Sequence, residues 1–287
     1  MTDAPGRGRA ATADELPELA RWRRLYEDVR AGLADPAPCG WVAVTRAAAP
    51  SGEGVPQLAD AAIAVDLRRA AAWMRRLADR AATENGPAAT LRARPLSDGP
   101  LLALLGASMA EDRVRLDALG RELEAEPGAL AAVAALAVMP LLHACRRALA
   151  EQVPADWTHG YCPVCGAWPT LAEARGVERS RHHGCARCGA SWFAGWLRCP
   201  YCGTSDHQRV GALVGEEPGA RDRVETCEVC RGYVKTLTVL LPIEADRIAL
   251  ADLDSLDLDL AALLHGYRRP PAPGRLGSLR VEAGRAS

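Results

Sequence analysis

The stretch YCPVCG, residues 161–166, holds two cysteines three positions apart, followed by a glycine. The motif returns three times downstream, as CARCG (185–189), CPYCG (199–203) and CEVC (227–230), so that four CxxC pairs use eight of the ten cysteines in a chain of 287 residues. A CxxC turn directs two thiolates at one ion, and two such turns form the tetrahedral four-sulfur site typical of structural zinc. The sequence therefore predicts two metal sites. It also predicts that strands connect the turns in this part of the chain.

The lengths between the turns favour pairing each turn with its neighbour in sequence. This leaves 19 residues inside the first site and 24 inside the second, which suits a zinc ribbon or a rubredoxin-like hairpin. A cross-braced pairing of first with third and second with fourth turn is the alternative. The predicted metal ligands are Cys162, Cys165, Cys185 and Cys188 for the first site, and Cys199, Cys202, Cys227 and Cys230 for the second. Four thiolates bind both zinc and iron, so the donor set leaves the metal open.

Neighbouring residues differ in how well they fit the turn. Glycine follows the second cysteine in the first three pairs, where it adopts a positive φ without steric cost. In the fourth pair Arg231 precedes Gly232, and we expect that turn to be one residue off the pattern. The remaining cysteines, Cys39 and Cys145, are expected to be ordinary buried thiols. His143 is expected in the core or at a helix end. His182 and His183 are close enough to Cys185 in sequence to approach the metal, but an exposed loop is the expected placement.

The chain divides by composition near residue 155. Helical periodicity over residues 12–33, 55–82, 100–126 and 128–152 predicts an all-helical bundle in the first part. Alternating runs at 191–199 and 233–242 predict strands, and residues 244–269 return to a helical pattern. The predicted fold class is α+β and multi-domain. The expected units are a helical bundle (1–155), two tetra-cysteine ribbons (156–198 and 199–241), a C-terminal helix (242–269) and a disordered tail (270–287).

Composition and charge exclude several classes of function. The net charge is −1, and residues 157–240 hold ten Arg or Lys against eight Asp or Glu, a weak basic footprint for a nucleic-acid binder. The first 20 residues lack the apolar core of a secretory signal. The apolar run from Ala129 to Cys145 is short for a membrane span and is interpreted as a buried helix. We expect a cytoplasmic protein. Because thiols are kept reduced in that compartment, we expect its clustered cysteines to bind metal rather than form disulfides.

No catalytic motif accompanies the cysteines. The sequence has no phosphate-binding loop, no HExxH helix and no nucleophile elbow. A closed four-thiolate site leaves no coordination position for substrate. We predict a protein that is not an enzyme, with no catalytic or cofactor-binding residue besides the metal ligands. The alternative to the function given below is a zinc-ribbon nucleic-acid-binding module or a general protein-interaction module.

The order of the motifs resembles the FdhE family of formate dehydrogenase accessory proteins. The resemblance rests on YCPVCGAWPT, GCARCGASW, RCPYCG, VETCEVCRGYVKTL and ADLDSLDLDLAALLHGY, and covers about Trp157 to Tyr267. All eight cysteines match the family pattern, as do Glu225, Tyr233 and Lys235. Arg231 departs from it, and the C-terminal extension that some members carry is not seen.

This resemblance implies a cytoplasmic, non-catalytic maturation factor or chaperone. Such a protein binds the catalytic subunit of respiratory formate dehydrogenase and is needed for its activity. It also implies rubredoxin-like sites associated with iron. Interface anchors are often aromatic, which makes Trp168, Trp192 and Trp196 candidate partner contacts, although each also suits the core of a ribbon.

Overall fold

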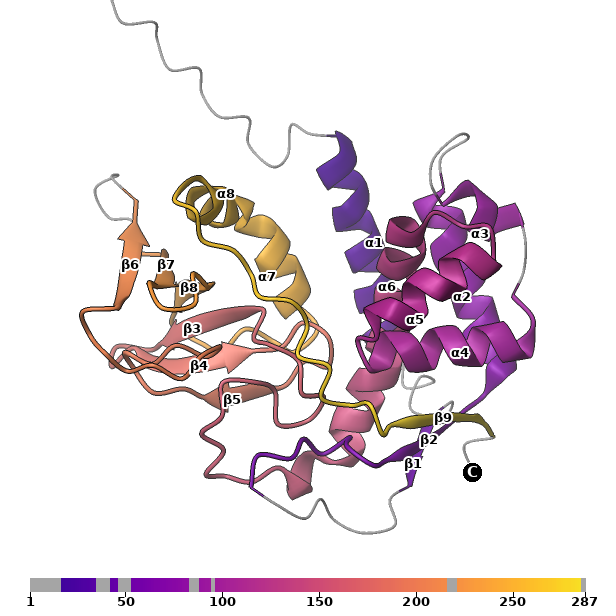
Figure 1. Ribbon diagram of the computed structural model, residues 1–287, viewed down its shortest axis with the longest axis horizontal. Helices are drawn as coiled ribbons and strands as arrows, with labels where there is room; N and C mark the ends of the chain where they lie inside the picture. Colours follow the sequence, from indigo (N-terminus) through magenta and orange to yellow (C-terminus); the bar gives the residue numbers. More distant parts are fainter. Residues whose placement is uncertain are drawn as a thin grey trace, which may run out of the picture.

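The structure divides into a helical half and a sheet half that lie side by side, as Figure 1 shows. It is a computed structural model. The described residues are 17–34, 42–45, 53–82, 88–93, 96–215 and 221–284. The predictions for two parts of the chain lie outside these ranges. They are the start of the first predicted helix, residues 12–16, and Cys39. Of the first 20 residues, which were searched for a secretory signal, only 17–20 are described.

The helical half is arranged around one long central helix, α6 (Pro127–Ala148). The other helices are α1 (Pro17–Ala34), α2 (Leu67–Ala81), α3 (Ala89–Ala93), α4 (Asp98–Met109), α5 (Arg113–Glu122) and a 3-10 turn at Ala150–Gln152. Helix α6 packs against α1, α2, α4 and α5. Within the described ranges it is the one helix long and apolar enough to cross a membrane, and 72% of that apolar window is buried. The prediction of a buried core helix is confirmed.

A small sheet interrupts the predicted all-helical bundle. Strands β1 (Val42–Thr45) and β2 (Ala62–Val65) pair antiparallel. The predicted helix over 55–82 is therefore wrong in its first part, because Ile63 and Val65 are β-branched, fully buried and two residues apart, which is strand periodicity. The helix begins only after Asp66, whose carboxylate accepts hydrogen bonds from the N–H groups of Arg68 and Arg69 at 3.0 and 3.2 Å.

The C-terminal tail returns to this small sheet. Strand β9 (Arg280–Ala283) pairs parallel with β2, so the chain crosses from the sheet half back to the helical half (Figure 1). Leu276 is 1% exposed on the way. The prediction of a disordered tail from Pro270 is wrong for the described residues up to 284. Composition alone did not reveal the tail's partner, which lies more than 200 positions earlier in the chain.

The sheet half is one continuous six-stranded sheet. Its strand order is β5-β4-β3-β8-β7-β6, in which the parallel pair β3–β8 joins the two antiparallel hairpin systems. The strands are β3 (Leu171–Arg175), β4 (Ser180–Gly184), β5 (Ser191–Phe193), β6 (Val210–Val214), β7 (Arg223–Cys227) and β8 (Tyr233–Val239). The two predicted ribbons thus share a sheet, and their independence as domains stays a prediction.

Two helices complete the sheet half in place of the single predicted one. Helix α7 (Ile248–Asp254) and helix α8 (Leu256–Leu264) meet at Ser255. Similarly, the predicted helix over 100–126 is divided into α4 and α5 by Glu111, whose φ is 57°. The fold class, a helical N-terminal region followed by two tetra-cysteine groups and C-terminal helices, is confirmed, with the small sheet as an addition.

Candidate metal centres

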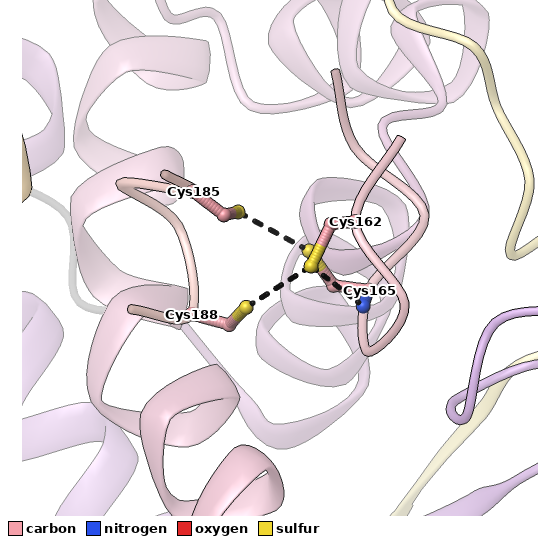
Figure 2. Close-up of side chains that lie close together, drawn as sticks. All are labelled: Cys162, Cys165, Cys185 and Cys188. Carbon is pink, nitrogen blue, oxygen red and sulfur yellow. Dashed lines mark hydrogen bonds between the residues drawn. The ribbon is translucent and has the colours of Figure 1, made fainter. Parts of the chain in front are cut away.

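The first four predicted ligands form a closed cluster of sulfur atoms. The Sγ atoms of Cys162, Cys165, Cys185 and Cys188 all lie within 4.8 Å of one another. Figure 2 shows the two pairs facing each other from separate segments, with Sγ distances of 3.5 Å for Cys162–Cys188 and 3.6 Å for Cys165–Cys185. Around a tetrahedral ion with metal–sulfur distances of about 2.3 Å, sulfurs lie about 3.8 Å apart. The donor set and its spacing therefore fit a four-thiolate ion.

Local hydrogen bonds shape each turn as expected from the sequence. Gly166 N–H donates to the Cys162 carbonyl at 2.9 Å, and Gly189 N–H to the Cys185 carbonyl at 2.8 Å. The two glycines have φ of 71° and 73°, a region that side chains with a Cβ rarely enter. The sequence thus specifies these turns locally, residue by residue.

Helical residues enclose the first cluster. Its four cysteines are at most 1% exposed and belong to the main hydrophobic core, together with α6. The turn itself accepts hydrogen bonds from the helical half: Gln57 N–H donates to the Pro163 carbonyl at 2.7 Å, and Leu58 N–H to that of Val164 at 3.0 Å. An ion bound here would lie in the shared core of both halves.

A half-buried arginine adds a further link beside the first cluster. Arg187, inside the second CxxC turn, donates to the carbonyls of Ser108 and Met109 at the end of α4, at 2.6 and 3.2 Å. It also pairs with Glu111 at 3.6 Å. Burial raises the pKa of Glu111, an effect that Arg187 opposes. Arg187 therefore satisfies the last carbonyls of α4 while lying close to the thiolates.

The second four ligands also converge, but nearer the surface. The Sγ atoms of Cys199, Cys202, Cys227 and Cys230 lie within 4.8 Å of one another, with 3.6 Å for Cys199–Cys230 and for Cys202–Cys227. Cys202 is exposed and Cys230 half-buried, and this cluster lies outside the main core. The donor set fits the same kind of ion in a wetter environment.

The fourth turn keeps the pattern that its sequence breaks. Arg231 occupies the position of the turn glycine with a φ of 56°, so the prediction of a turn one residue off the pattern is wrong. The guanidinium is held by Glu228 at 2.5 Å and by the His265 carbonyl at 2.8 Å, and lies over the Tyr267 ring at 4.1 Å. These contacts compensate the strain of a non-glycine residue in this conformation. A side chain at Gly232 would come within 2.6 Å of Tyr201.

The environments change the acidity of the thiols in different ways. Burial raises the pKa of Cys162 and of Cys188 well above the ordinary thiol value. At Cys227 burial also raises the pKa, but hydrogen bonds from the N–H groups of Cys230 and Val229 outweigh it and the pKa is lowered overall. A bound metal cation offsets the repulsion and desolvation that several thiolates would otherwise suffer at one buried point.

All eight cysteines predicted as ligands are brought together, in the sequential grouping that the spacing favours. That they bind metal stays a prediction. Cys145 and His143 are buried on α6, as expected. His182 and His183 belong to neither cluster, and the expectation of an exposed loop is wrong: both lie on β4 between β3 and β5, and His183 is 3% exposed.

Sequence reasoning missed a charged network that holds the C-terminal helices. Lys235, the chain's one lysine, is 0% exposed on β8, and its Nζ lies 2.7 Å from Asp252 and 2.6 Å from Asp259. Arg269 pairs with the same two carboxylates at 2.6 and 3.0 Å, and the Tyr233 hydroxyl donates to Asp259 at 2.6 Å. A lone lysine in an arginine-rich chain was the available signal. Glu225, the third residue of the family pattern, pairs with Arg181 at 2.6 Å.

The candidate aromatic contacts are divided between core and surface. Trp192 is 5% exposed and donates to the His159 carbonyl. Trp168 is half-buried and donates to the Pro271 carbonyl. Trp196 is 46% exposed, with Arg223 over its ring at 5.0 Å. Trp196 alone of the three is well exposed.

Comparison with known proteins supports the resemblance drawn from the cysteine framework. No protein-family model matches the chain. The chain is 35% identical over 124 residues to a protein named Protein FdhE homolog from Pseudomonas aeruginosa, covering 39% of this chain and 40% of that one. A protein of the same name from Aquifex aeolicus is 27% identical over 117 residues, again 39% and 40%. The matches thus span about two fifths of these relatives.

A solved structure extends the likeness to nearly the whole fold. The crystal structure of the FdhE protein from Pseudomonas aeruginosa superimposes with a TM-score of 0.52 at 24% identity, covering 91% of this chain and 92% of that one. At this identity the match shows the fold. The resemblance to the FdhE family predicted from the sequence is confirmed by these relatives.

Proposed function

We propose that this protein is a non-catalytic assembly factor that binds the catalytic subunit of a formate dehydrogenase and is needed for its activity. The observation that carries the proposal is the pair of four-cysteine clusters, arranged on a fold shared with FdhE proteins. Closed four-thiolate sites hold structure and offer no open position for a substrate, which supports a role in binding rather than turnover.

The eight clustered cysteines would hold one metal ion in each group. We propose iron, as the family resemblance implies, with zinc as the alternative that the donor set equally accepts. Bound iron would supply one-electron redox chemistry, whereas zinc would supply none. Reduced thiolates are maintained in the cytoplasm, which is the compartment we propose.

A surface between the two halves suits the proposed client. A cavity of about 450 Å³ lies between the end of α6 and the edge strand β5, lined among others by Arg146, Trp157 and Phe193. Phe193 is 60% exposed, and Trp196 and Leu197, which follow it, are 46% and 55% exposed. Aromatic side chains are enriched at protein interfaces, and tryptophan is among the residues that most often dominate binding energy there. We therefore place the contact with the catalytic subunit along β5.

Genetic complementation with copurification tests this function. A deletion strain should lose formate oxidation while still transcribing the catalytic subunit, and the tagged wild-type protein should restore activity and copurify with that subunit. Phe193→Ala should weaken the copurification severalfold. The matched control is Val177→Ala, which changes a side chain 94% exposed on the turn between β3 and β4. Normal formate oxidation in the deletion strain would refute the proposal, and equal capture by F193A and wild type would refute the placement along β5.

A further inference from the structure

A second cavity lies beside Cys199 and Cys202 of the second cluster, and its lining also includes Tyr161, which precedes Cys162 of the first. It encloses about 220 Å³ and is lined by the segment 158–161, by β4 and by the turn 199–203. This is smaller than the roughly 300–1,000 Å³ of sites for drug-sized ligands. The size fits a compact chemical group.

The charged side chains of its wall all have the same sign. Arg181, Arg198 and Arg275 line the cavity, and its sixteen lining residues include no Asp or Glu. Arg181 is paired with Glu225, but neither Arg198 nor Arg275 has a carboxylate partner among the described residues. Cys199 and Cys202, two of the predicted ligands of the second cluster, also line the cavity. Two arginine side chains are therefore available to an incoming anion.

Buried polar atoms without partners lie on the same wall. His183 is 3% exposed, and neither of its ring nitrogens has a hydrogen-bond partner; Arg181 is 2% exposed, and its Nε has none. Leaving a buried donor without a partner is costly, so such groups are rare unless they serve a ligand or ordered water. In either protonation state the imidazole offers at least one N–H donor.

Aromatic rings position one of the arginines. The Arg275 guanidinium lies over the Tyr161 ring at 3.6 Å and near that of Trp168 at 5.5 Å. Stacking uses the face of a guanidinium and leaves its N–H edge free for two parallel hydrogen bonds. Tyr201, edge-on to Trp168 at 5.3 Å, adds another flat wall. The site thus combines a bidentate donor with apolar surfaces.

We propose that this cavity binds an oxyanion, a carboxylate or phosphate carried on a compact group, through Arg198, Arg275 and the buried His183. The anion is either a free small acid or an acidic side chain of a partner polypeptide. The rival explanation is that the two arginines only neutralise the charge of the second cluster.

Calorimetric titration of the full-length, metal-loaded protein tests the site. The probes are inorganic phosphate, benzoate, and a tripeptide with one glutamate and blocked ends, with benzamide as the uncharged counterpart of benzoate. At least one anionic probe should bind and benzamide should not. Tighter binding of benzoate or phosphate assigns the site to free acids, and tighter binding of the peptide assigns it to a partner's side chain.

Substitutions then locate the binding. Arg198→Gln and Arg275→Gln change exposed residues and should each weaken the bound probe about tenfold, with metal content and circular dichroism unchanged. The matched control is Arg113→Gln, an exposed arginine at the start of α5, which should bind as wild type. The proposal is overturned if no anion binds or if the variant carrying both Arg198→Gln and Arg275→Gln binds as tightly as wild type. It is also overturned if this double variant loses metal while its metal-loaded fraction binds the anion normally.

Discussion

The two cysteine clusters use the same turns and the same four sulfurs, yet they occupy different surroundings. The first is at most 1% exposed, inside a core that includes α6, and its turns exchange hydrogen bonds with the helical half. The second has an exposed Cys202 and lies outside that core, beside strands β6–β8 and the C-terminal helices. Identical ligand chemistry can therefore serve two purposes, since surroundings decide how much of the fold depends on each ion.

Loss of one ligand should separate the two clusters most strongly. Cys165→Ala should unfold most of the protein, because metal binding contributes about 10–16 kcal/mol in small zinc modules and a whole domain has a net stability of only about 5–15 kcal/mol. Cys202→Ala should unfold the second module, by which we mean strands β6–β8 and the second cluster, and should leave the helical half folded. Circular dichroism and limited proteolysis measure both.

Cys145→Ala is the control, because it removes a buried thiol outside either cluster. It should leave metal content unchanged. Equal loss of helical signal in C165A and C202A would remove the distinction between the clusters.

The next largest effect should come from the network behind the second module. Lys235→Met removes the fully buried cation from Asp252 and Asp259, which keep the partly exposed Arg269, and should reduce the free energy of unfolding by about 3 kcal/mol. The exposed pair of Arg115 with Glu122 is the control, since Arg115→Gln should cost less than about 1 kcal/mol. Denaturant unfolding that shows similar values for the two variants would contradict the assigned role of Lys235.

A single methyl group should test how closely the two modules approach. A Cβ at Gly160 would lie 1.9 Å from the carbonyl oxygen of Pro200, inside the third CxxC turn. Gly160→Ala should separate the modules and cost about 1–3 kcal/mol by overpacking. Gly195→Ala meets no atom within 4 Å and should leave the melting temperature nearly unchanged. A wild-type melting temperature for G160A would mean that this approach is not required.

The smallest effect should be a pH dependence of stability that comes from His143 on α6, the helix beside the first cluster. Burial lowers the pKa of His143 to about 4, with Arg146 and Arg147 contributing. The unfolded chain then binds the proton more tightly, so stability is complete above about pH 6.5 and falls as the pH drops towards 4. At pH 5.5 wild type should have lost about 1 kcal/mol more than His143→Gln, relative to pH 7.5. The prediction would be refuted if wild type and His143→Gln differed in free energy of unfolding by the same amount at pH 5.5 and at pH 7.5.

The sequence was most informative where structure depends on neighbours in the chain. Each CxxC turn is determined by a few adjacent residues, so the eight cysteines and their grouping were predictable. The pairing of β9 with β2, the joining of both ribbons through β3 and β8, and the burial of Lys235 depend on partners far away. Arg231 shows the limit of local rules, because contacts with His265 and Tyr267 allow a conformation that its residue type disfavours.

Metal release to a coloured chelator tests the central distinction most directly. The native protein, purified without oxygen, should hold two metal ions per chain, one for each four-cysteine group. One equivalent should leave the exposed second cluster under native conditions, and the other only when denaturant unfolds the core around the first. Release of both ions at one rate, or fewer than two ions per chain, would contradict this account.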